Sequence, residues 1–213
     1  MSIELDICNK TISVCGKRAS GKSILALHLI ETAHAKFKKI FLVCPTEEIN
    51  AHYTKNGVIK QECVFSNWNE NWAKDLTTQL TKINSNKPKA EMQHVLLVLD
   101  DVFADVDLHH SPILRSIFMR SRHYGLSVMI LTQTLHSIPP FARINSDWMI
   151  FGQVNRASVQ LAAEEFRTIP KDEFVELYNR STTDHQFLVV NCNSVKDSNR
   201  NAVYGVIKAP CSD

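Results

Sequence analysis

The sequence predicts an α/β fold, a three-layer sandwich in which helices cover both faces of a mostly parallel sheet. The first observation is that short, continuously apolar segments alternate along the chain with helical stretches. Strands of a parallel sheet are buried on both faces and joined by helices, so this alternation is typical of the class. The second is size: 213 residues, 44% hydrophobic and 22% charged, can form one domain with a substantial core. We therefore expect residues 1–213 to form a single domain.

The predicted strands are apolar runs too short for helices, most of which end at a glycine, a proline or a polar pair. In chain order they are residues 11–15, 40–44, 95–99, 128–131, 148–151, 187–190 and 202–207. Such continuous runs favour a sheet that is covered by helices on both sides.

The predicted helices are the stretches whose apolar residues recur at helical spacing. They are residues 24–34, 112–124 and 156–180. The second begins with Ser111 as N-cap and Pro112 at the first helical position, and Gly125 ends it. The third is expected to break near Pro170.

Residues 46–90 differ from the rest in being polar, and we expect them to form a helical insertion between the second and third strands. Trp68, Trp72 and Leu76 lie at helical spacing in this segment. Two functions are open to the tryptophans, and we expect them to pack in the core rather than stack on a ligand.

Composition excludes several classes of protein. The formal net charge of +2 gives no overall attraction to nucleic acid, so any DNA contact needs a local basic patch. No secretory signal and no apolar run of about 18 residues is visible, so we expect a soluble protein made inside a cell, with no membrane-spanning segment.

The cysteines lack a C-x-x-C pair and are expected to be reduced thiols, with a zinc site as the alternative. They are Cys8, Cys15, Cys44, Cys63, Cys192 and Cys211.

Residues 16–23, GKRASGKS, match the phosphate-binding loop pattern G-x-x-x-x-G-K-S and lie between a predicted strand and a predicted helix. Backbone N–H groups of such a loop point at phosphate oxygens. Lys22 is expected to contact the β and γ phosphates, and Ser23 to give its hydroxyl to Mg²⁺. The expected nucleotide-binding residues are Gly16, Lys17, Arg18, Ala19, Ser20, Gly21, Lys22, Ser23 and Ile24. The alternative is a chance match.

Two adjacent acids follow the third predicted strand. Asp100, at the tip of a buried strand beside a phosphate loop, is expected to hold Mg²⁺. Asp101 can orient or deprotonate the attacking water, which is typical of hydrolytic P-loop NTPases of the ASCE type rather than of nucleotide switches. The alternative for Asp101 is a cap on the following turn, and aspartate is shorter than the glutamate common at this position.

Gln133 ends the fourth predicted strand, where it can sense the γ-phosphate or hold the attacking water, or simply bond within a turn. Ligands of open α/β sheets bind beyond the carboxyl ends of the strands. The groups that follow strand ends are therefore expected to meet at one edge, and they are residues 16–23, Asp100-Asp101, Gln133 and the region of Gly152.

Several arginines are candidates for contacts with phosphate. Arg115 and Arg122 share one helix face, Arg120 is nearby, and Arg143 follows a Pro-Pro-Phe segment. In a ring of subunits, one of them could reach a neighbour's γ-phosphate, or they could contact DNA phosphates. For each one, a solvated surface charge remains the alternative.

Together these segments resemble the genome-packaging ATPases of large double-stranded DNA viruses and virophages, in the FtsK–HerA group of P-loop ATPases. The resemblance covers roughly residues 11–192 and lies in GKRASGKS, LLVLDDVF and MRSRHYGLSVMILTQTLHSIPPFARINSDWMIFG. Its details are the paired aspartates, Arg122-His123 before the fourth strand, Thr132-Gln133 after it, and then Pro140, Arg143 and Asn145. The late segment 184–189, DHQFLV, is also similar, whereas Ser121 stands where glycine is expected.

The resemblance implies an ATPase that uses ATP and Mg²⁺ to drive double-stranded DNA into a preformed capsid. It implies a homo-oligomeric ring, a pentamer or hexamer, together with a capsid or vertex protein. It implies that Gln133 senses the γ-phosphate. It also implies that an arginine, Arg122 or Arg143, acts in trans on the γ-phosphate of a neighbouring subunit. The expected location is the host cytoplasm at the virus assembly site, or the virion.

Three other functions remain open for this sequence. A P-loop nucleoside or nucleotide kinase would need an arginine-rich lid, and no compact R-x-x-x-R follows the fourth strand. A GTPase-like switch would need an N-K-x-D motif, which neither 133–135 nor 152–154 supplies. A cellular HerA-like DNA-translocating ATPase shares the core but usually carries additional domains.

Overall fold

The computed structural model describes residues 5–55, 57–104, 106–193 and 203–210. Within these ranges the strands form one eight-stranded sheet in the order β3-β2-β4-β5-β1-β6-β7-β8. The strands are β1 Thr11–Cys15, β2 Lys39–Val43, β3 Val64–Phe65, β4 Val95–Asp100, β5 Leu126–Thr132, β6 Trp148–Phe151, β7 Gln186–Asn191 and β8 Tyr204–Lys208. Neighbours from β3 through to β6 pair in parallel, whereas β7 pairs antiparallel with β6 and β8 antiparallel with β7. The mostly parallel sheet is confirmed.

The helices also follow the predicted order, with additions. The α-helices are α1 Lys22–Ala33, α2 Glu47–Asn50, α3 Glu70–Asn84, α4 Pro112–Tyr124, α5 Pro140–Ile144, α6 Arg156–Glu165 and α7 Lys171–Ser181. Short 3₁₀ helices cover His34–Lys36, Gln61–Cys63, Lys89–Glu91, Val102–Ala104, Val106–His110 and Leu135–Ser137. The predicted caps of α4 are present, because the Ser111 side chain accepts from the Leu114 N–H and Gly125 is left-handed at the other end.

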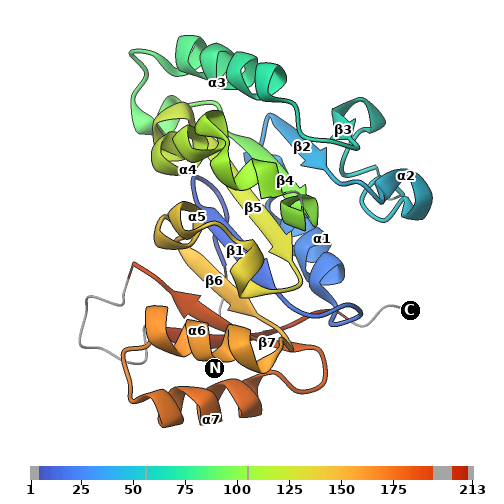
Figure 1. The fold of residues 1–213 in the computed structure, drawn as a ribbon. Helices are drawn as coiled ribbons and strands as arrows, with labels where there is room; N and C mark the ends of the chain where they lie inside the picture. Colours follow the sequence, from blue (N-terminus) through green and yellow to red (C-terminus); the bar gives the residue numbers. More distant parts are fainter. Residues whose placement is uncertain (1–4, 56, 105, 194–202, 211–213) are drawn as a thin grey trace.

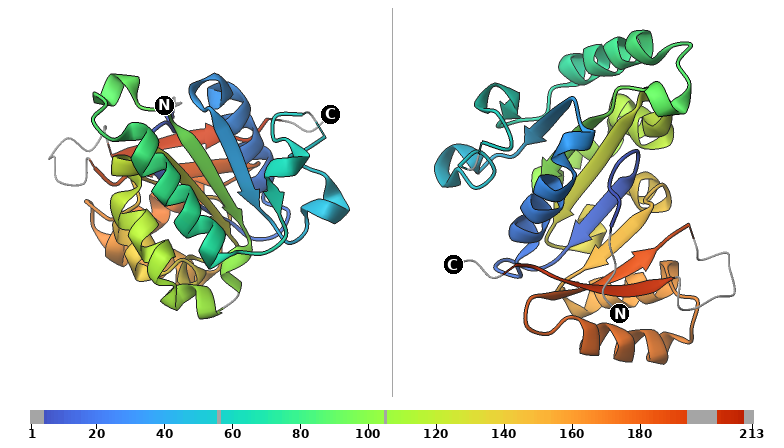
Figure 2. Two further views of the ribbon diagram at one scale, coloured as in Figure 1. Left: turned by 90° about the horizontal axis from the view of Figure 1, so that it is seen from above. Right: turned by 180° about the vertical axis from the view of Figure 1, so that it is seen from behind.

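The sheet separates two hydrophobic cores, which makes the three layers visible in Figures 1 and 2. Helices α3, α4, α5, α6 and α7 pack on one face, and α1 packs on the other with Leu5, Ile7, Tyr53, Ile59 and Cys63. Strand β4 shows the division directly. Val95, Leu97 and Leu99 belong to the first core, and Leu96 and Val98 to the second, as the alternation of side chains along a strand requires.

The prediction for residues 46–90 was partly wrong. The segment holds helices α2 and α3, but it also adds β3, which extends the sheet beside β2. Trp68 precedes α3 rather than lying in it, because Asn69 is the N-cap and accepts from the Trp72 N–H. Both tryptophans are half-buried and pack on the outside of the core, with Trp72 edge-on to Phe41 at 5.3 Å. The last predicted strand began at residue 202, which lies outside the described residues.

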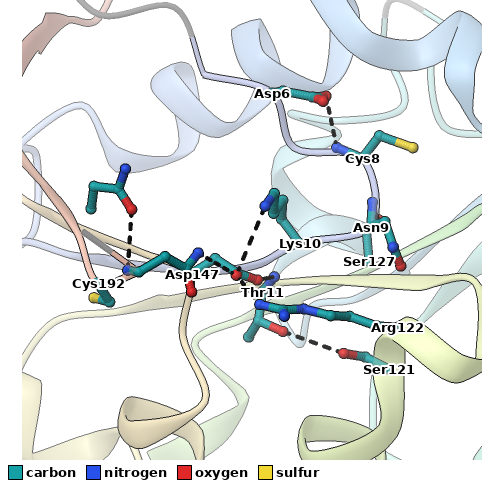
Figure 3. A network of polar contacts seen from close by, with 12 residues as sticks. Asp6, Cys8, Asn9, Lys10, Thr11, Ser121, Arg122, Ser127, Asp147 and Cys192 are labelled. Atoms are coloured by element: carbon teal, nitrogen blue, oxygen red, sulfur yellow. Dashed lines mark hydrogen bonds and ion pairs between the residues drawn. The ribbon is translucent and has the colours of Figure 1, made fainter. Parts of the chain in front are cut away.

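The edge at which the strands begin is tied together by Asp147, whose side chain is fully buried (Figure 3). Its carboxylate accepts from the Thr11 N–H at 2.8 Å, from the Asn193 side-chain amide at 2.7 Å and from the Arg122 guanidinium. Its backbone N–H donates to the Thr11 carbonyl, and its carbonyl accepts from the Cys192 N–H. Asp147 thus joins the start of β1, the approach to β6, the end of α4 and the end of β7 through its side chain and its backbone.

We expect Asp147→Ala to lower the free energy of unfolding by about 2–4 kcal/mol, because it leaves a buried N–H and a guanidinium without their acceptor. Urea denaturation measures the change. Asp6→Ala is the matched control, since the Asp6–Lys36 pair is more than half exposed on both sides and should be worth less than about 1 kcal/mol. Equal losses in the two variants would contradict the role given to Asp147.

Candidate functional site

The loop of residues 16–23 joins β1 to α1 and is fixed by the strands on either side of β1. The Gly16 N–H donates to the Thr132 carbonyl at the end of β5, and the Lys17 N–H to the Gln153 carbonyl after β6. Gly16 has no room for a side chain, because a Cβ would lie 2.5 Å from the Ser20 Oγ. Gly21 has a φ of 90°, which favours glycine. Glycine at position 16 therefore leaves room for the Ser20 and Lys22 side chains, whereas position 21 favours glycine through its backbone conformation.

The interior of the loop is built to receive an anion. Lys22 is only 7% exposed, and its ammonium donates to the Lys17 carbonyl at 3.3 Å. The Ser20 Oγ is buried and has no hydrogen-bond partner among the described residues. The N-terminus of α1 adds its unpaired backbone N–H groups. A buried cation, an unused hydroxyl and a helix N-terminus together form a cradle for phosphate oxygens.

Asp100 ends β4 and faces this loop. Its Oδ2 accepts from the Tyr53 hydroxyl at 2.8 Å and from the Ser23 hydroxyl at 3.4 Å. The pKa of Asp100 is raised from 3.8 to about 6, mainly by burial and also by the neighbouring Asp101, against the opposing effects of the Tyr53 hydrogen bond and of Lys22. A buried carboxylate beside a serine hydroxyl fits a hard divalent cation such as Mg²⁺, which prefers oxygen ligands.

Tyr53 is a member of this site that sequence reasoning missed. It lies in the polar insertion, yet its side chain is 1% exposed, and burial raises the pKa of its hydroxyl well above 10, so it acts as a donor. The buried carboxylate of Glu47 holds this segment by accepting from the N–H groups of His52, Tyr53 and Thr54, at 3.1, 2.8 and 2.9 Å. No local pattern identifies Tyr53, because its burial depends on the fold of the whole insertion.

Asp101 and Gln133 are the remaining candidate residues at the carboxyl ends of β4 and β5. The Asp101 N–H donates to the Leu131 carbonyl of β5, and the Gln133 amide donates to the Asp101 carboxylate at 3.3 Å. Asp101 has a φ of 52°, a left-handed conformation that aspartate adopts more readily than most residues other than glycine. The expected convergence of the strand-end groups is confirmed, since the loop, both acids, Gln133 and the segment after Gly152 are joined by hydrogen bonds.

The structure does not bring Arg122 and Arg143 to this site. Arg122 bonds to Asp147 (Figure 3), which lies at the opposite edge of the sheet. The side chain of Arg122 is 55% exposed. Arg143 forms two hydrogen bonds of 2.8 Å with Glu165 and one of 2.6 Å with the Ile138 carbonyl, and its side chain is 11% exposed. Neither arginine therefore serves the phosphate loop of its own chain.

The zinc alternative has no support in the part of the chain that is described, where no group of three or more His, Cys, Asp or Glu residues could hold a metal. The five described cysteines are unpaired, and Cys211 lies outside the described residues. Burial raises the pKa of Cys15 and of Cys192 to about 12, so both thiols are unreactive at neutral pH. None of the helices within the described ranges has the length and apolar character needed to cross a membrane.

The raised pKa of Asp100 predicts a stability that depends on pH. In the folded chain its pKa is about 6 rather than 3.8, so the folded state holds a proton that the unfolded state has lost, and stability falls as pH rises through this window. Asp100→Asn removes the buried charge and is expected to stabilise the nucleotide-free protein at pH 7.5, by at most a few kcal/mol at about 1.4 per pKa unit.

Thermal unfolding at pH 4 and pH 7.5 checks this. The stability that Asp100→Asn gains over the wild type should nearly vanish at pH 4. Asp75→Asn, which changes an exposed acid in the interior of α3, controls for loss of charge alone. A destabilised Asp100→Asn protein at pH 7.5 would refute the explanation.

Comparison with known proteins places the chain in a family. Residues 5–201 match the family described as "Poxvirus A32 protein". Uncharacterized protein 075L of Invertebrate iridescent virus 6 is 26% identical over 190 residues, which span 88% of this chain and 72% of that protein. Uncharacterized protein 015R of Frog virus 3 is 22% identical over 217 residues, and the chain spans 65% of its length.

Solved structures share the fold. The genome packaging NTPase B204 from Sulfolobus turreted icosahedral virus 2, in complex with AMPPCP, superposes with a TM-score of 0.66 and 14% identity over 97% of this chain and 100% of that one. The cytoplasmic domain of the Thermomonospora curvata Type VII secretion ATPase EccC gives a TM-score of 0.59 and 13% identity, covering 99% of this chain and 25% of that one. At these identities the similarity concerns the fold.

Proposed function

Because this chain belongs to the Poxvirus A32 protein family, we propose that it is an ATP-hydrolysing motor that moves double-stranded DNA into viral capsids. One observation carries the proposal. The phosphate loop, Asp100 and the Asp101–Gln133 pair lie along one sheet edge and are linked by hydrogen bonds. That set contains a phosphate cradle, an acid for a metal and a second acid for water, which is what hydrolysis of a nucleoside triphosphate needs.

The nucleotide is ATP. Structures of B204, which shares the fold, are described in complex with AMPPCP, AMP and ATP-γ-S. In this chain, Lys22 would contact the β and γ phosphates, and backbone N–H groups of residues 16–23 would hold the remaining oxygens. Ile24 continues the helix behind the loop.

Mg²⁺ would be held by the Ser23 hydroxyl and by Asp100, directly or through water, and when bound it neutralises charge on the transferred phosphoryl group. Tyr53 keeps the Asp100 carboxylate oriented toward Ser23. Asp101 would accept the proton of the attacking water, and Gln133, bonded to Asp101, would align that water with the γ-phosphate.

The partners follow from the family and the motor function. We propose a homo-oligomeric ring around double-stranded DNA that acts with a capsid or vertex protein at the virus assembly site in the host cytoplasm or on the virion. Fold-level support comes from B204, a genome packaging NTPase, and from the pCW3 conjugation coupling protein TcpA, with a TM-score of 0.53 and 15% identity. In such a ring Arg122 is the better candidate to act in trans, because its side chain is more exposed than that of Arg143.

Lys22→Ala is expected to abolish ATP hydrolysis, and Asp101→Asn to keep ATP binding while lowering turnover by at least about 100-fold, the low end for a general base. Phosphate release and equilibrium binding of ATP measure the two effects separately. Asp172→Asn, a change of an exposed acid in helix α7, serves as the control. Wild-type turnover by Asp101→Asn would rule out its role with the attacking water.

The arginines are distinguished by mixing variants. An Arg122→Ala subunit keeps its own site but supplies no arginine, whereas a Lys22→Ala subunit is inactive but still supplies one. If Arg122 acts in trans, mixing the two inactive proteins restores part of the hydrolysis. Arg143→Ala should show no such rescue. Both changes should lower the unfolding midpoint, because Arg143 is bonded to Glu165 and Arg122 to the buried Asp147. If hydrolysis returns only when Arg143→Ala, and not Arg122→Ala, is mixed with Lys22→Ala, then Arg143 is the arginine that acts in trans.

A further inference from the structure

The strand order fixes the direction in which a nucleoside triphosphate must lie across the phosphate loop. Strand β1, which carries the loop, has β5 and then β4 on one side, and β6, β7 and β8 on the other. Asp100, Asp101 and Gln133 follow β4 and β5, so the γ-phosphate end lies on that side. The base and ribose must therefore leave the loop on the side of β7 and β8, where the proposed function has assigned no residues.

Two adjoining hollows lie on that side, each bordered by the loop and by the turn that leads into β7. They share Asp184 and His185 and have volumes of about 190 and 200 Å³. The first is also lined by Ala19, Ser20, Gln153, Thr182 and Gln186. The second is also lined by Gly21, Ile24, Lys208, Ala209 and Pro210. Each is smaller than the roughly 300 Å³ at which ligand pockets usually begin, so each suits one ring system rather than a whole nucleotide.

The turn is held against the loop by specific contacts. The His185 Nδ1 lies 3.4 Å from the Ser20 carbonyl oxygen and 3.4 Å from the position of a Cβ on Gly21, so the imidazole sits beside the start of α1. The His185 carbonyl accepts from the Ala209 N–H at 3.1 Å, which joins the turn to the end of β8. Asp184 and His185 have φ values of 50° and 55°. Two successive left-handed residues other than glycine are costly, and such strain is found preferentially at ligand sites.

The chemistry of the second hollow suits a nucleobase. Ile24, Ala209 and Pro210 give it an apolar wall, and the imidazole of His185 offers a flat ring for stacking. At the rim, the Asp184 carboxylate is fixed by the Lys208 ammonium at 2.5 Å, and it can accept from amino groups on the edge of a base. The first hollow has polar side chains, Gln153, Thr182 and Gln186, that can bond to ribose hydroxyls.

We propose that these two hollows form the nucleoside subsite of the nucleotide site, with a purine between His185 and the Ile24–Pro210 wall and the ribose in the polar hollow. The assignment rests on the proposed function, since it assumes that the triphosphate binds in the 16–23 loop. A purine fits better than a pyrimidine because its larger ring covers more of the apolar wall.

The test compares the binding of ATP, CTP and inorganic tripolyphosphate to the full chain by calorimetry. The wild-type protein should bind ATP more tightly than CTP or tripolyphosphate. His185→Ala and Ile24→Ala, which each remove a side chain that lines the second hollow, should each weaken ATP binding about tenfold and change tripolyphosphate binding by less than twofold. His34→Ala, beyond the far end of α1, is the control and should bind all three ligands as the wild type does.

The possible failures are distinguishable. If wild-type protein binds tripolyphosphate as tightly as ATP, or if both wall variants bind ATP normally, the nucleoside subsite is refuted while the proposed function stands. If both variants lose ATP and tripolyphosphate equally, the residues shape the loop and do not hold a base, which also refutes the subsite. If neither ligand binds to wild-type protein, the proposed function fails and the subsite with it.

Discussion

The parallel pairing of β1 between β5 and β6 is the constraint on which the rest of the site depends. It brings the carboxyl ends of three strands to the same edge, and β4 adds a fourth through its pairing with β5. The phosphate loop is then held on both sides, by the Gly16 bond to Thr132 and the Lys17 bond to Gln153. A slip of one residue would move every side chain of a strand from one core to the other, so the packing of both cores fixes the register.

The two edges of the sheet have opposite characters. At the edge where strands begin, Asp147 is buried with its charge paired and its oxygens used, so it stabilises the fold. The edge where strands end holds a buried carboxylate with a raised pKa, a serine hydroxyl with no hydrogen-bond partner among the described residues, and an aspartate in the left-handed conformation. Each of these features costs stability in the absence of ligand, and their concentration at one edge is what a binding site for a charged ligand requires.

Features encoded locally could be predicted from the sequence, and features that depend on distant contacts could not. The loop, the acid pair and Gln133 were identified because each directly follows an apolar run, and the ends of parallel strands must meet. Tyr53 and β3 were missed, because a polar segment gives no sign that one of its tyrosines will be buried against β4. The arginines were identified as charges, but their bonds to Asp147 and Glu165 depend on tertiary packing.

The central claim is that hydrolysis at this site drives movement along DNA. The most direct measurement is the rate of ATP hydrolysis by the purified chain, with and without linear duplex DNA, at two salt concentrations. The account predicts hydrolysis that DNA stimulates, with a stimulation that weakens at the higher salt concentration because the contacts are to phosphates. Hydrolysis that is indifferent to DNA at both salt concentrations, or transfer of phosphate to a nucleoside instead of water, would contradict it.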